Sequence, residues 1–460
     1  MLEKHIVEKI IDIALSTGGD FAEVFVEKKN SSNLFMIDGK IESSISGRDF
    51  GVGIRIFKGV FSVYGYTNDV TEENLIETTK KIAKSIEGTK EDITINLIKQ
   101  DIENINKIKI FPESIKKSEK IDLMRIASHS AKNYDPLISQ TRVSLGDVKQ
   151  NILIANSEGL WVTDERVRGR ISIESIASDG NDMQTGRVSP GASAGFEFFK
   201  SLDIENEARE ASRIAKTMLF ANYSPSGKFP VVINNKFGGV IFHEACGHGL
   251  EASSVAKGNS IFAGKVGELI ASPLVSAVDD GTIPNEWGSL TIDDEGHKTQ
   301  RNLLIENGIL KGYLVDKLNG RRMGMESTGS GRRESYKYAP TSRMTNTFIL
   351  NGNSSFEEII KNTEYGIFAK NMGGGSVNPT TGDFNFAVME GYIIKNGEIK
   401  EPIRGATLIG NGGEVLKKID MVGDNLGYGQ GMCGSSSGSI PTNVGQPVLR
   451  VSEITVGGRK

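Results

Sequence analysis

The sequence predicts an α+β protein, with an α/β amino-terminal half and a β-rich carboxyl-terminal half that carries one histidine-containing helix. Three observations support this fold class. At 460 residues the chain exceeds what one hydrophobic core usually organises, so two domains are expected. Before residue 225, segments with helical spacing of apolar residues follow segments that alternate as strands. After residue 225, short alternating segments with glycine-rich connections dominate.

The main domain boundary is predicted in the stretch that contains Pro225 and Gly227, because both residue types interrupt regular structure. The expected domains are therefore residues 1–225 and 226–460. Residues 1–95 and 115–225 are candidate halves of the first domain, since residues 89–116 are polar and isoleucine-rich without a clear period, which indicates a connector.

The first half opens with an amphipathic helix, in which Leu2, Ile6, Ile10 and Ile13 recur at helical spacing. Alternation and turn residues then predict a strand at 21–27, a hairpin over 34–41 with an Asp-Gly turn, and a second hairpin over 51–66. A helix follows that Thr71 caps and Gly88 ends. These segments make a small α/β unit.

The next segments predict an antiparallel sheet between two helices. Helices are expected at 118–131 and 205–220, and four short strands at 141–145, 152–155, 160–163 and 171–176. In the second half we expect a strand at 229–233, the histidine helix, Asn-Gly hairpin turns at 307–308 and 396–397, and a helix at 356–362 that Ser354 or Ser355 caps.

Composition and charge exclude several classes of partner. With 38% hydrophobic and 24% charged residues, the chain resembles an ordinary globular protein. A net charge of -4 gives no electrostatic footprint for nucleic acid or an anionic membrane, so we expect neither partner. The first helix lacks the apolar run of a signal peptide, no stretch is long enough to span a membrane, and there are two cysteines. A reducing cytoplasm is the expected location.

His243, Glu244 and His248 offer what a zinc hydrolase needs, namely two imidazole ligands and a carboxylate to take a proton from bound water. The two histidines are five residues apart, so a regular helix would rotate one from the other by roughly 140°. The spacing therefore demands a distortion. A single π-type turn would bring the rings together, and Gly247 and Gly249 would ease it.

A buried helix without metal, whose histidines bond to backbone groups, is the alternative, and the spacing alone does not choose between the two. A catalytic zinc usually takes three protein ligands and water. The candidates for a third ligand are four carboxylates and two sulfurs, and spacing cannot choose among them either: Glu251, Asp293, Asp294, Glu295, Cys246 and Cys433.

The segment from His243 to Glu251 resembles the metal-binding motif of the TldD/PmbA family, in particular its TldD-type metallopeptidase branch. Further segments resemble the same family in the same order, so that the similarity covers essentially the whole chain: Gly47 to Gly53, Thr67-Asn68-Asp69, Trp287-Gly288-Ser289, Asp293 to Gly296, Gly331 to Ser335, and Arg343 to Asn346.

The resemblance implies a zinc metallopeptidase, with a β-rich catalytic domain that carries the metal-binding helix. It assigns the third ligand to a cysteine near the carboxyl terminus, which is Cys433 here, beside His243 and His248. Glu244 would be the catalytic base, and Cys246 a small core residue. The implied substrate is a peptide or unfolded polypeptide, and the implied assembly is a dimer with a PmbA/TldE-like paralogue or a second copy.

Two further groups of charged residues are open to interpretation. Arg332, Arg333 and Arg343 could bind a peptide carboxylate or carbonyl groups, or could form structural ion pairs. The Asp293-Asp294-Glu295 run lacks the spacing of a calcium loop, so we expect a solvated turn there.

Two rival functions remain at this point: a non-catalytic regulatory subunit that binds metal for structure only, and a hydrolase that matures one dedicated peptide.

Overall fold

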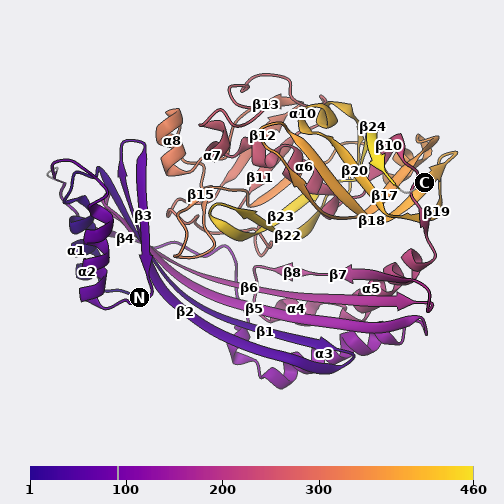
Figure 1. The fold of residues 1–460 in the computed structure, drawn as a ribbon, viewed down its shortest axis with the longest axis horizontal. Helices are drawn as coiled ribbons and strands as arrows, with labels where there is room; N and C mark the ends of the chain where they lie inside the picture. The colour runs from indigo at the N-terminus through magenta and orange to yellow at the C-terminus, as the bar shows by residue number, and fades with distance from the viewer. Residues whose placement is uncertain (91–92, 459–460) are drawn as a thin grey trace.

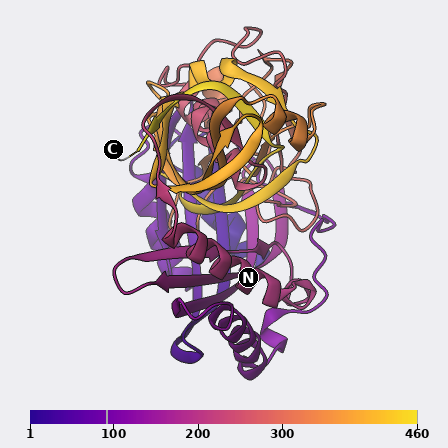
Figure 2. The same ribbon diagram turned by 90° about the vertical axis from the view of Figure 1, so that its right-hand side faces the viewer.

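The computed structural model describes residues 1–90 and 93–458. A long curved sheet from the amino-terminal half lies beneath a β-rich carboxyl-terminal half (Figure 1). Helices cover the far face of this sheet and one of its ends, whereas the carboxyl-terminal half faces the concave side (Figures 1 and 2). The predicted α+β class is confirmed. The domain boundary near residue 225 stays a prediction.

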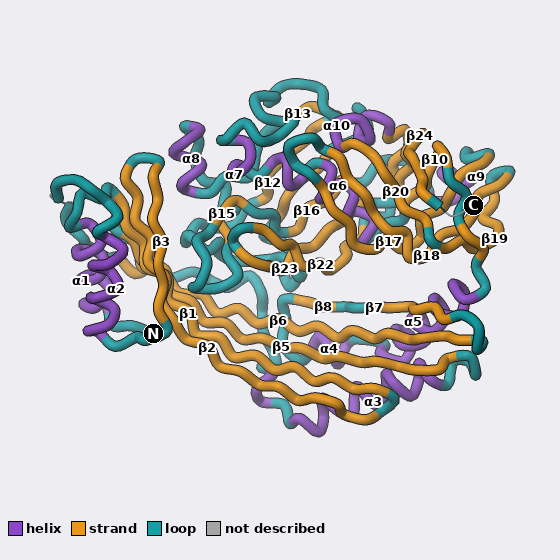
Figure 3. The backbone as a smooth tube through the Cα atoms, in the orientation of Figure 1, coloured by secondary structure: helices purple, strands orange, loops and turns teal. Residues whose placement is uncertain are grey.

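The amino-terminal sheet has the strand order β3-β2-β1-β5-β6-β4, and β7 and β8 both pair with β6. Its strands are β1 (Phe21–Ile37), β2 (Lys40–Lys58), β3 (Phe61–Thr67), β4 (Ile98–Gln100), β5 (Ile138–Asn156), β6 (Leu160–Ser178), β7 (Met183–Val188) and β8 (Gly191–Ala192). Figure 3 shows the four long strands, β1, β2, β5 and β6, running side by side.

The four short strands expected between residues 141 and 176 are in fact two continuous ones. Strand β5 contains the segments 141–145 and 152–155, and β6 contains 160–163 and 171–176. The intervening residues include Gln150 and Arg166, which are polar yet buried because they face the other half of the molecule. A polar interface therefore interrupts the apolar alternation without any turn of the chain.

The helices of this half are α1 (Lys4–Leu15), α2 (Glu72–Ala83), α3 (Lys117–Lys132), α4 (Glu197–Ser201) and α5 (Ile204–Leu219), with the 3-10 turn η1 (Pro112–Ser114) before α3. Helix α2 ends at Ala83, before the expected stop at Gly88. Thr71 occupies its N-cap position but caps nothing with its side chain, because the hydroxyl donates to the Asp69 carboxylate instead, at 2.8 Å.

The carboxyl-terminal half contains two larger sheets, of order β17-β10-β24-β20-β18-β19-β9 with β21 on β24, and β13-β12-β11-β16-β23-β22, and the small pair β14-β15. Its strands are β9 (Asn222–Tyr223), β10 (Gly227–Ile233), β11 (Ala277–Asp280), β12 (Arg301–Glu306), β13 (Ile309–Leu310), β14 (Gly331–Arg332), β15 (Thr341–Ser342), β16 (Asn346–Ile349), β17 (Tyr365–Val377), β18 (Asp383–Lys395), β19 (Glu398–Arg404), β20 (Ala406–Asn411), β21 (Ile419–Val422), β22 (Gly427–Ser435), β23 (Gly438–Gln446) and β24 (Leu449–Gly457).

The helices of this half are short. They are η2 (Phe237–Gly239), α6 (Val240–Ala245), η3 (Gly247–Leu250), α7 (Ala252–Val255), α8 (Lys317–Met323), α9 (Phe356–Lys361), α10 (Gly412–Val415) and η4 (Leu416–Lys418). Both predicted Asn-Gly turns are confirmed, since Asn307 and Asn396 have φ of 49° and 54°. Ser355 caps α9 in a capping box with Glu358.

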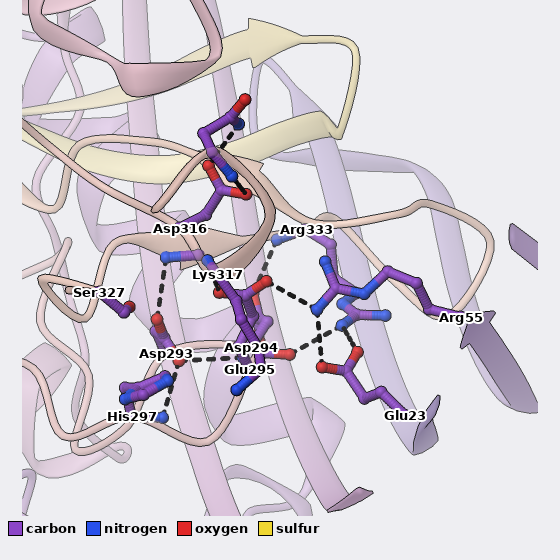
Figure 4. A network of polar contacts seen from close by, with 12 residues as sticks. Glu23, Arg55, Asp293, Asp294, Glu295, His297, Asp316, Lys317, Ser327 and Arg333 are labelled. Atoms are coloured by element: carbon purple, nitrogen blue, oxygen red, sulfur yellow. Dashed lines mark hydrogen bonds and ion pairs between the residues drawn. The ribbon is translucent and has the colours of Figure 1, made fainter. Parts of the chain in front are cut away.

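The two halves meet in a buried network of charges (Figure 4). Arg55 on β2 pairs with Glu23 at 2.8 Å and with Glu295 at 2.6 Å. Arg333 pairs with Glu23 at 2.5 Å and also donates to the backbone of Asp294. Although burial opposes the ionised form of Glu23, the two guanidinium groups hold its pKa below the usual value.

The turn predicted at residues 293–295 is present, but the prediction that it is solvated is wrong. All three side chains are buried, and Asp294 and Glu295 pair with Arg166 and Arg55 of the amino-terminal sheet. Asp293 accepts backbone hydrogen bonds from Glu295, His297 and Gly331, and burial beside Glu295 raises its pKa well above the usual value.

None of the helices within residues 1–90 and 93–458 combines the length and the apolar character needed to cross a bilayer.

Candidate metal centre

The histidine segment is held in place by its apolar residues. Val240, Ile241 and Phe242 on α6 are buried in the main hydrophobic cluster of the carboxyl-terminal half, together with Ala245 and Leu250. Gly412 lies against the end of α6 so closely that a Cβ there would come within 1.9 Å of the Ala245 carbonyl oxygen. Tight packing on all sides therefore fixes the direction of His243.

The distortion that the five-residue spacing demands is a helix break, not the π-type turn that we predicted. Helix α6 ends at Ala245, and Cys246 leaves the helical region with φ −130° and ψ −50°. The 3-10 turn η3 then carries His248. On either side of the break the hydrogen bonds are ordinary four-residue ones, from Cys246 to Phe242 and from Leu250 to Cys246. Tightening of the second turn, rather than widening of the first, brings the rings together.

The three predicted ligand side chains converge. The rings of His243 and His248 lie 5.0 Å apart at an interplanar angle of 84°. The Cys433 sulfur lies 3.2 Å from Nε2 of His243 and 3.3 Å from Nε2 of His248. One ligand atom from each residue falls within 4.8 Å of the other two. Two imidazole nitrogens and one sulfur thus point at a common space.

Strand β22 delivers Cys433, whose neighbour in register on β23 is Ile440. The side chain is buried, which opposes ionisation of the thiol, but His243 and His248 outweigh this and lower the Cys433 pKa to about 3. The thiolate is the form of cysteine that binds metals. Cys246, by contrast, is buried among apolar groups that raise its pKa, and it takes no part in the cluster.

A carboxylate lies behind His248. Glu251 is buried, and its Oε2 is 3.3 Å from Nδ1 of His248, on the side of the ring away from the sulfur. Burial opposes protonation of this imidazole, but Glu251 and Cys433 raise the His248 pKa well above its usual value. A carboxylate on the second ring nitrogen is a common partner of metal-binding histidines, because it fixes the tautomer and the orientation of the ring.

Arg343 joins this carboxylate to the cysteine. Its Nε lies 3.6 Å from Oε1 of Glu251, and its Nη2 donates to the carbonyl oxygen of Cys433 at 2.5 Å. The side chain is fully buried. Arg332 donates to the carbonyl oxygens of Met344 and Pro441. Arg333 and Arg343 thus take the structural ion-pair role, with Glu23 and Glu251, whereas Arg332 bonds only to carbonyl oxygens and forms no ion pair in the described part of the chain.

Glu244 lies at the open side of the cluster. Its Oε2 is 3.6 Å from Nε2 of His248, and 19% of its side chain is exposed. A cavity of about 410 Å³ opens here, lined by Glu244, His248, Glu251, Ser253, Ser254, Gly375, Ser376, Val377, Pro379, Met432, Cys433, Gly434 and Ser435. A carboxylate that faces both the ligand cluster and the cavity can exchange a proton with a water molecule between them.

The donor set fits a zinc ion. Two nitrogens and one sulfur are ligands that zinc accepts, and three protein ligands with an open fourth side are typical of catalytic rather than structural sites. His243, His248 and Cys433 supply the three, and the cavity supplies the open side. The alternative of two histidines bonded only to backbone groups does not hold, since Nδ1 of His243 is buried without a hydrogen-bond partner among the described residues.

Three domain profiles of one family match the chain. The PmbA/TldA metallopeptidase domain 1 matches residues 22–86, the central domain matches residues 111–219, and the C-terminal domain matches residues 226–458. The chain belongs to the TldD/PmbA family.

Relatives of the TldD/PmbA family align with the chain over almost its full length. A metalloprotease TldD homolog of Buchnera aphidicola is 40% identical and covers 95% of this chain and 93% of its own. One from Haemophilus influenzae is 39% identical, with coverage of 98% and 95%. The names of these relatives imply a metallopeptidase family with a metal cofactor.

Solved structures share the fold. A putative modulator of a DNA gyrase from Thermotoga maritima superposes with a TM-score of 0.80 at 23% identity, over 99% of this chain and 100% of that one. TldE from Thermococcus kodakarensis superposes with a TM-score of 0.76 at 21% identity, over 98% and 100%.

Sequence reasoning missed two parts of the site. Glu251 entered as a candidate ligand, and the structure places it behind His248 instead. The contact of Arg343 with both Glu251 and the Cys433 carbonyl had no sequence signal, because the three residues come from distant segments. The candidate ligands Asp293, Asp294 and Glu295 belong to the interface between the halves and not to this cluster.

Proposed function

We propose that this protein is a zinc metallopeptidase in which His243, His248 and Cys433 hold the metal and Glu244 is the catalytic residue. One observation carries the proposal: three ligand atoms converge beside a partly exposed carboxylate at the floor of an open cavity. A structural zinc site would have a fourth protein ligand, and among the described residues no fourth His, Cys, Asp or Glu joins the cluster. This favours an enzyme over a non-catalytic regulatory subunit.

The residues divide the chemistry between them. Bound zinc would polarise the scissile carbonyl and lower the pKa of its water molecule. Glu244 accepts the proton of that water and later donates it to the leaving amine, since its carboxylate faces both the cluster and the cavity. Glu251 keeps His248 in the tautomer whose Nε2 lone pair faces the cluster.

The substrate that we propose is a peptide or an unfolded polypeptide, with no nucleic acid or membrane involved, and the proposed location is the cytoplasm. The proposed assembly is a dimer, with a TldE-like paralogue or a second copy as the partner. The structural likeness to a protein named TldE supports a shared fold for two such subunits. The residues of the zinc site come from this chain, so we assign it the catalytic part.

Hydrolysis of unstructured peptides by the purified protein, alone and with a co-expressed partner, tests the proposal. We expect the zinc-loaded parent to cleave peptides and the Glu244→Gln variant to retain zinc but to lose at least about 10²-fold in rate, the usual minimum for general acid–base catalysis. Equal rates for the parent and this variant would contradict the role of Glu244. Peptides of graded length distinguish a broad peptidase from a hydrolase that matures a single peptide.

A further inference from the structure

A row of arginines on β6 faces the carboxyl-terminal half. Residues two apart on a strand share a face of the sheet, so Arg166, Arg168 and Arg170 lie on the same side. Arg166 is neutralised by Asp164 at 3.0 Å and by Asp294 at 2.6 Å. The other two guanidinium groups form no ion pair with any carboxylate in residues 1–90 and 93–458.

Arg168 stands out in this row. Its Nε is buried without a hydrogen-bond partner, and no other atom of its guanidinium group bonds to the described part of the chain, yet the side chain as a whole is only half-buried. Burial and the nearby charges of Arg166 and Arg332 lower its pKa to about 9. Solvent can therefore reach a guanidinium group that lacks its usual counterion.

Two neighbouring arginines, Arg170 and Arg332, add positive charge but donate most of their hydrogen bonds to neutral groups. Arg170 donates to Ser189 and, at 3.0 Å, to the carbonyl oxygen of Gln430. Arg332 donates through both terminal nitrogens to carbonyl oxygens, including that of Pro441 at 2.8 Å. Carbonyl groups accept hydrogen bonds without cancelling the positive charge of the donor. Positive potential therefore accumulates around the guanidinium group of Arg168, which has no partner of its own among the described residues.

This place is close to the proposed zinc site. Gln430 lies three residues before Cys433 on β22, which corresponds to on the order of 10 Å of extended strand. Pro441 is the neighbour in register of Met432, the residue before the cysteine. Arg170 and Arg332 thus both bond to the β22–β23 hairpin that delivers Cys433, and Figure 1 draws this hairpin above β6.

We propose that Arg168 binds a carboxylate group of the peptide substrate, while Arg170 and Arg332 supply the surrounding positive charge. A guanidinium fork suits a carboxylate because it offers two parallel donors. A flexible peptide fits this position better than a folded partner does, since Arg168 is half-buried between Arg166 and Arg170, both of which contact the carboxyl-terminal half. Arg170, two residues further along β6, reaches Gln430, which lies about three extended residues from Cys433 on β22, so a peptide held by Arg168 can extend toward the metal site.

The proposal rests on the proposed peptidase function, and binding can be measured without hydrolysis. In the Glu244→Gln background, fluorescence anisotropy follows amino-terminally labelled, unstructured peptides without acidic side chains, with either a free or an amidated carboxyl terminus. A third, amidated peptide carries one Glu near its end. We expect the free acid, the Glu peptide or both to bind on the order of tenfold more tightly than the neutral peptide, a difference that shrinks at high salt.

Arg168→Gln should abolish this preference, and Arg168→Lys should retain part of it because the charge remains. Arg142→Gln is the matched control, since Arg142 lies on the neighbouring strand β5 and already pairs with Glu174 at 3.2 Å. It should leave the preference intact. Zinc content and the unfolding temperature of each variant report whether it folds.

Equal binding of all three peptides to the unsubstituted site would overturn the proposal, and this comparison needs no arginine variant. A preference for carboxylate-bearing peptides that persists in a folded Arg168→Gln protein would also overturn the proposal. The same holds for an Arg168→Gln protein that loses dimer assembly while peptide binding is unchanged, because the counterion of Arg168 would then belong to a partner subunit. Carboxylate-dependent binding without any hydrolysis by the parent would contradict the peptidase function but would still support a carboxylate-binding site at Arg168.

Discussion

Replacing Glu251 by glutamine removes the negative charge behind His248 while keeping the shape of the side chain. The carboxylate lies 3.3 Å from Nδ1 of His248 and 3.6 Å from Nε of Arg343, and all three groups are largely shielded from water. Loss of such a partner of a metal-binding histidine typically lowers metal affinity about 10–100-fold, or about 1.4–2.7 kcal/mol. Arg343, which is fully buried, would also lose its nearest carboxylate, so we expect the upper part of this range.

Competition between the protein and a chromogenic chelator measures the zinc affinity directly. Glu244→Gln is the control, because Glu244 also lies near His248 but on the cavity side. It faces Nε2 of that ring and not Nδ1, the nitrogen that Glu251 contacts. The control should keep its zinc affinity and lose hydrolysis, whereas Glu251→Gln should lose zinc affinity. A folded Glu251→Gln protein that binds zinc as tightly as the parent would refute the positioning role of this carboxylate.

Three further predictions concern packing, the interface and pH. Gly412→Ala should lower the free energy of unfolding by roughly 1–3 kcal/mol and reduce zinc content, because the new Cβ meets the Ala245 carbonyl at the end of α6. A Cβ at Gly374 would have no atom of the described residues within 4 Å, so Gly374→Ala should change neither quantity. Arg333→Gln should lower the unfolding free energy in urea by about 3–5 kcal/mol, because buried carboxylates lose their partner; a loss below 1 kcal/mol would contradict this. Zinc affinity should rise with pH near neutrality, since zinc must displace the proton that the raised pKa keeps on His248, while Cys433, with a pKa of about 3, adds no further dependence. Calorimetry in buffers of different ionisation enthalpy measures the protons released. A pH-independent zinc affinity would contradict this prediction.

Local patterns predicted the local elements well. The Asn-Gly turns at 307–308 and 396–397 and the cap at Ser355 lie where the sequence placed them, because turn and cap geometry depend on the residues themselves. The pair of His243 and Glu244 indicated metal chemistry, and the structure brings His243 and His248 together as that chemistry requires. Only the family resemblance, and not the spacing, singled out Cys433, which lies 190 residues away from His243.

The errors have a common physical cause. Buried charges look like solvent-exposed ones in a sequence. The carboxylates of residues 293–295 therefore indicated a solvated turn, and the polar residues inside β5 and β6 indicated strand ends. Two of these carboxylates are buried against Arg55 and Arg166 of the amino-terminal sheet, and Arg166 is in turn buried against Asp294. The helix break at Cys246 likewise depends on tertiary packing, since either a widened or a tightened turn satisfies the spacing.

Elemental analysis of the purified protein, beside its His248→Ala and Cys433→Ala variants, measures directly whether these residues hold zinc. We expect about one zinc ion per chain in the parent and loss of zinc in both variants, because each residue supplies one of the three ligand atoms. A co-expressed partner subunit should be included, so that a site that forms only in the dimer is also measured. A parent without metal in both preparations, or a Cys433→Ala variant with full zinc occupancy, would contradict the proposed zinc site.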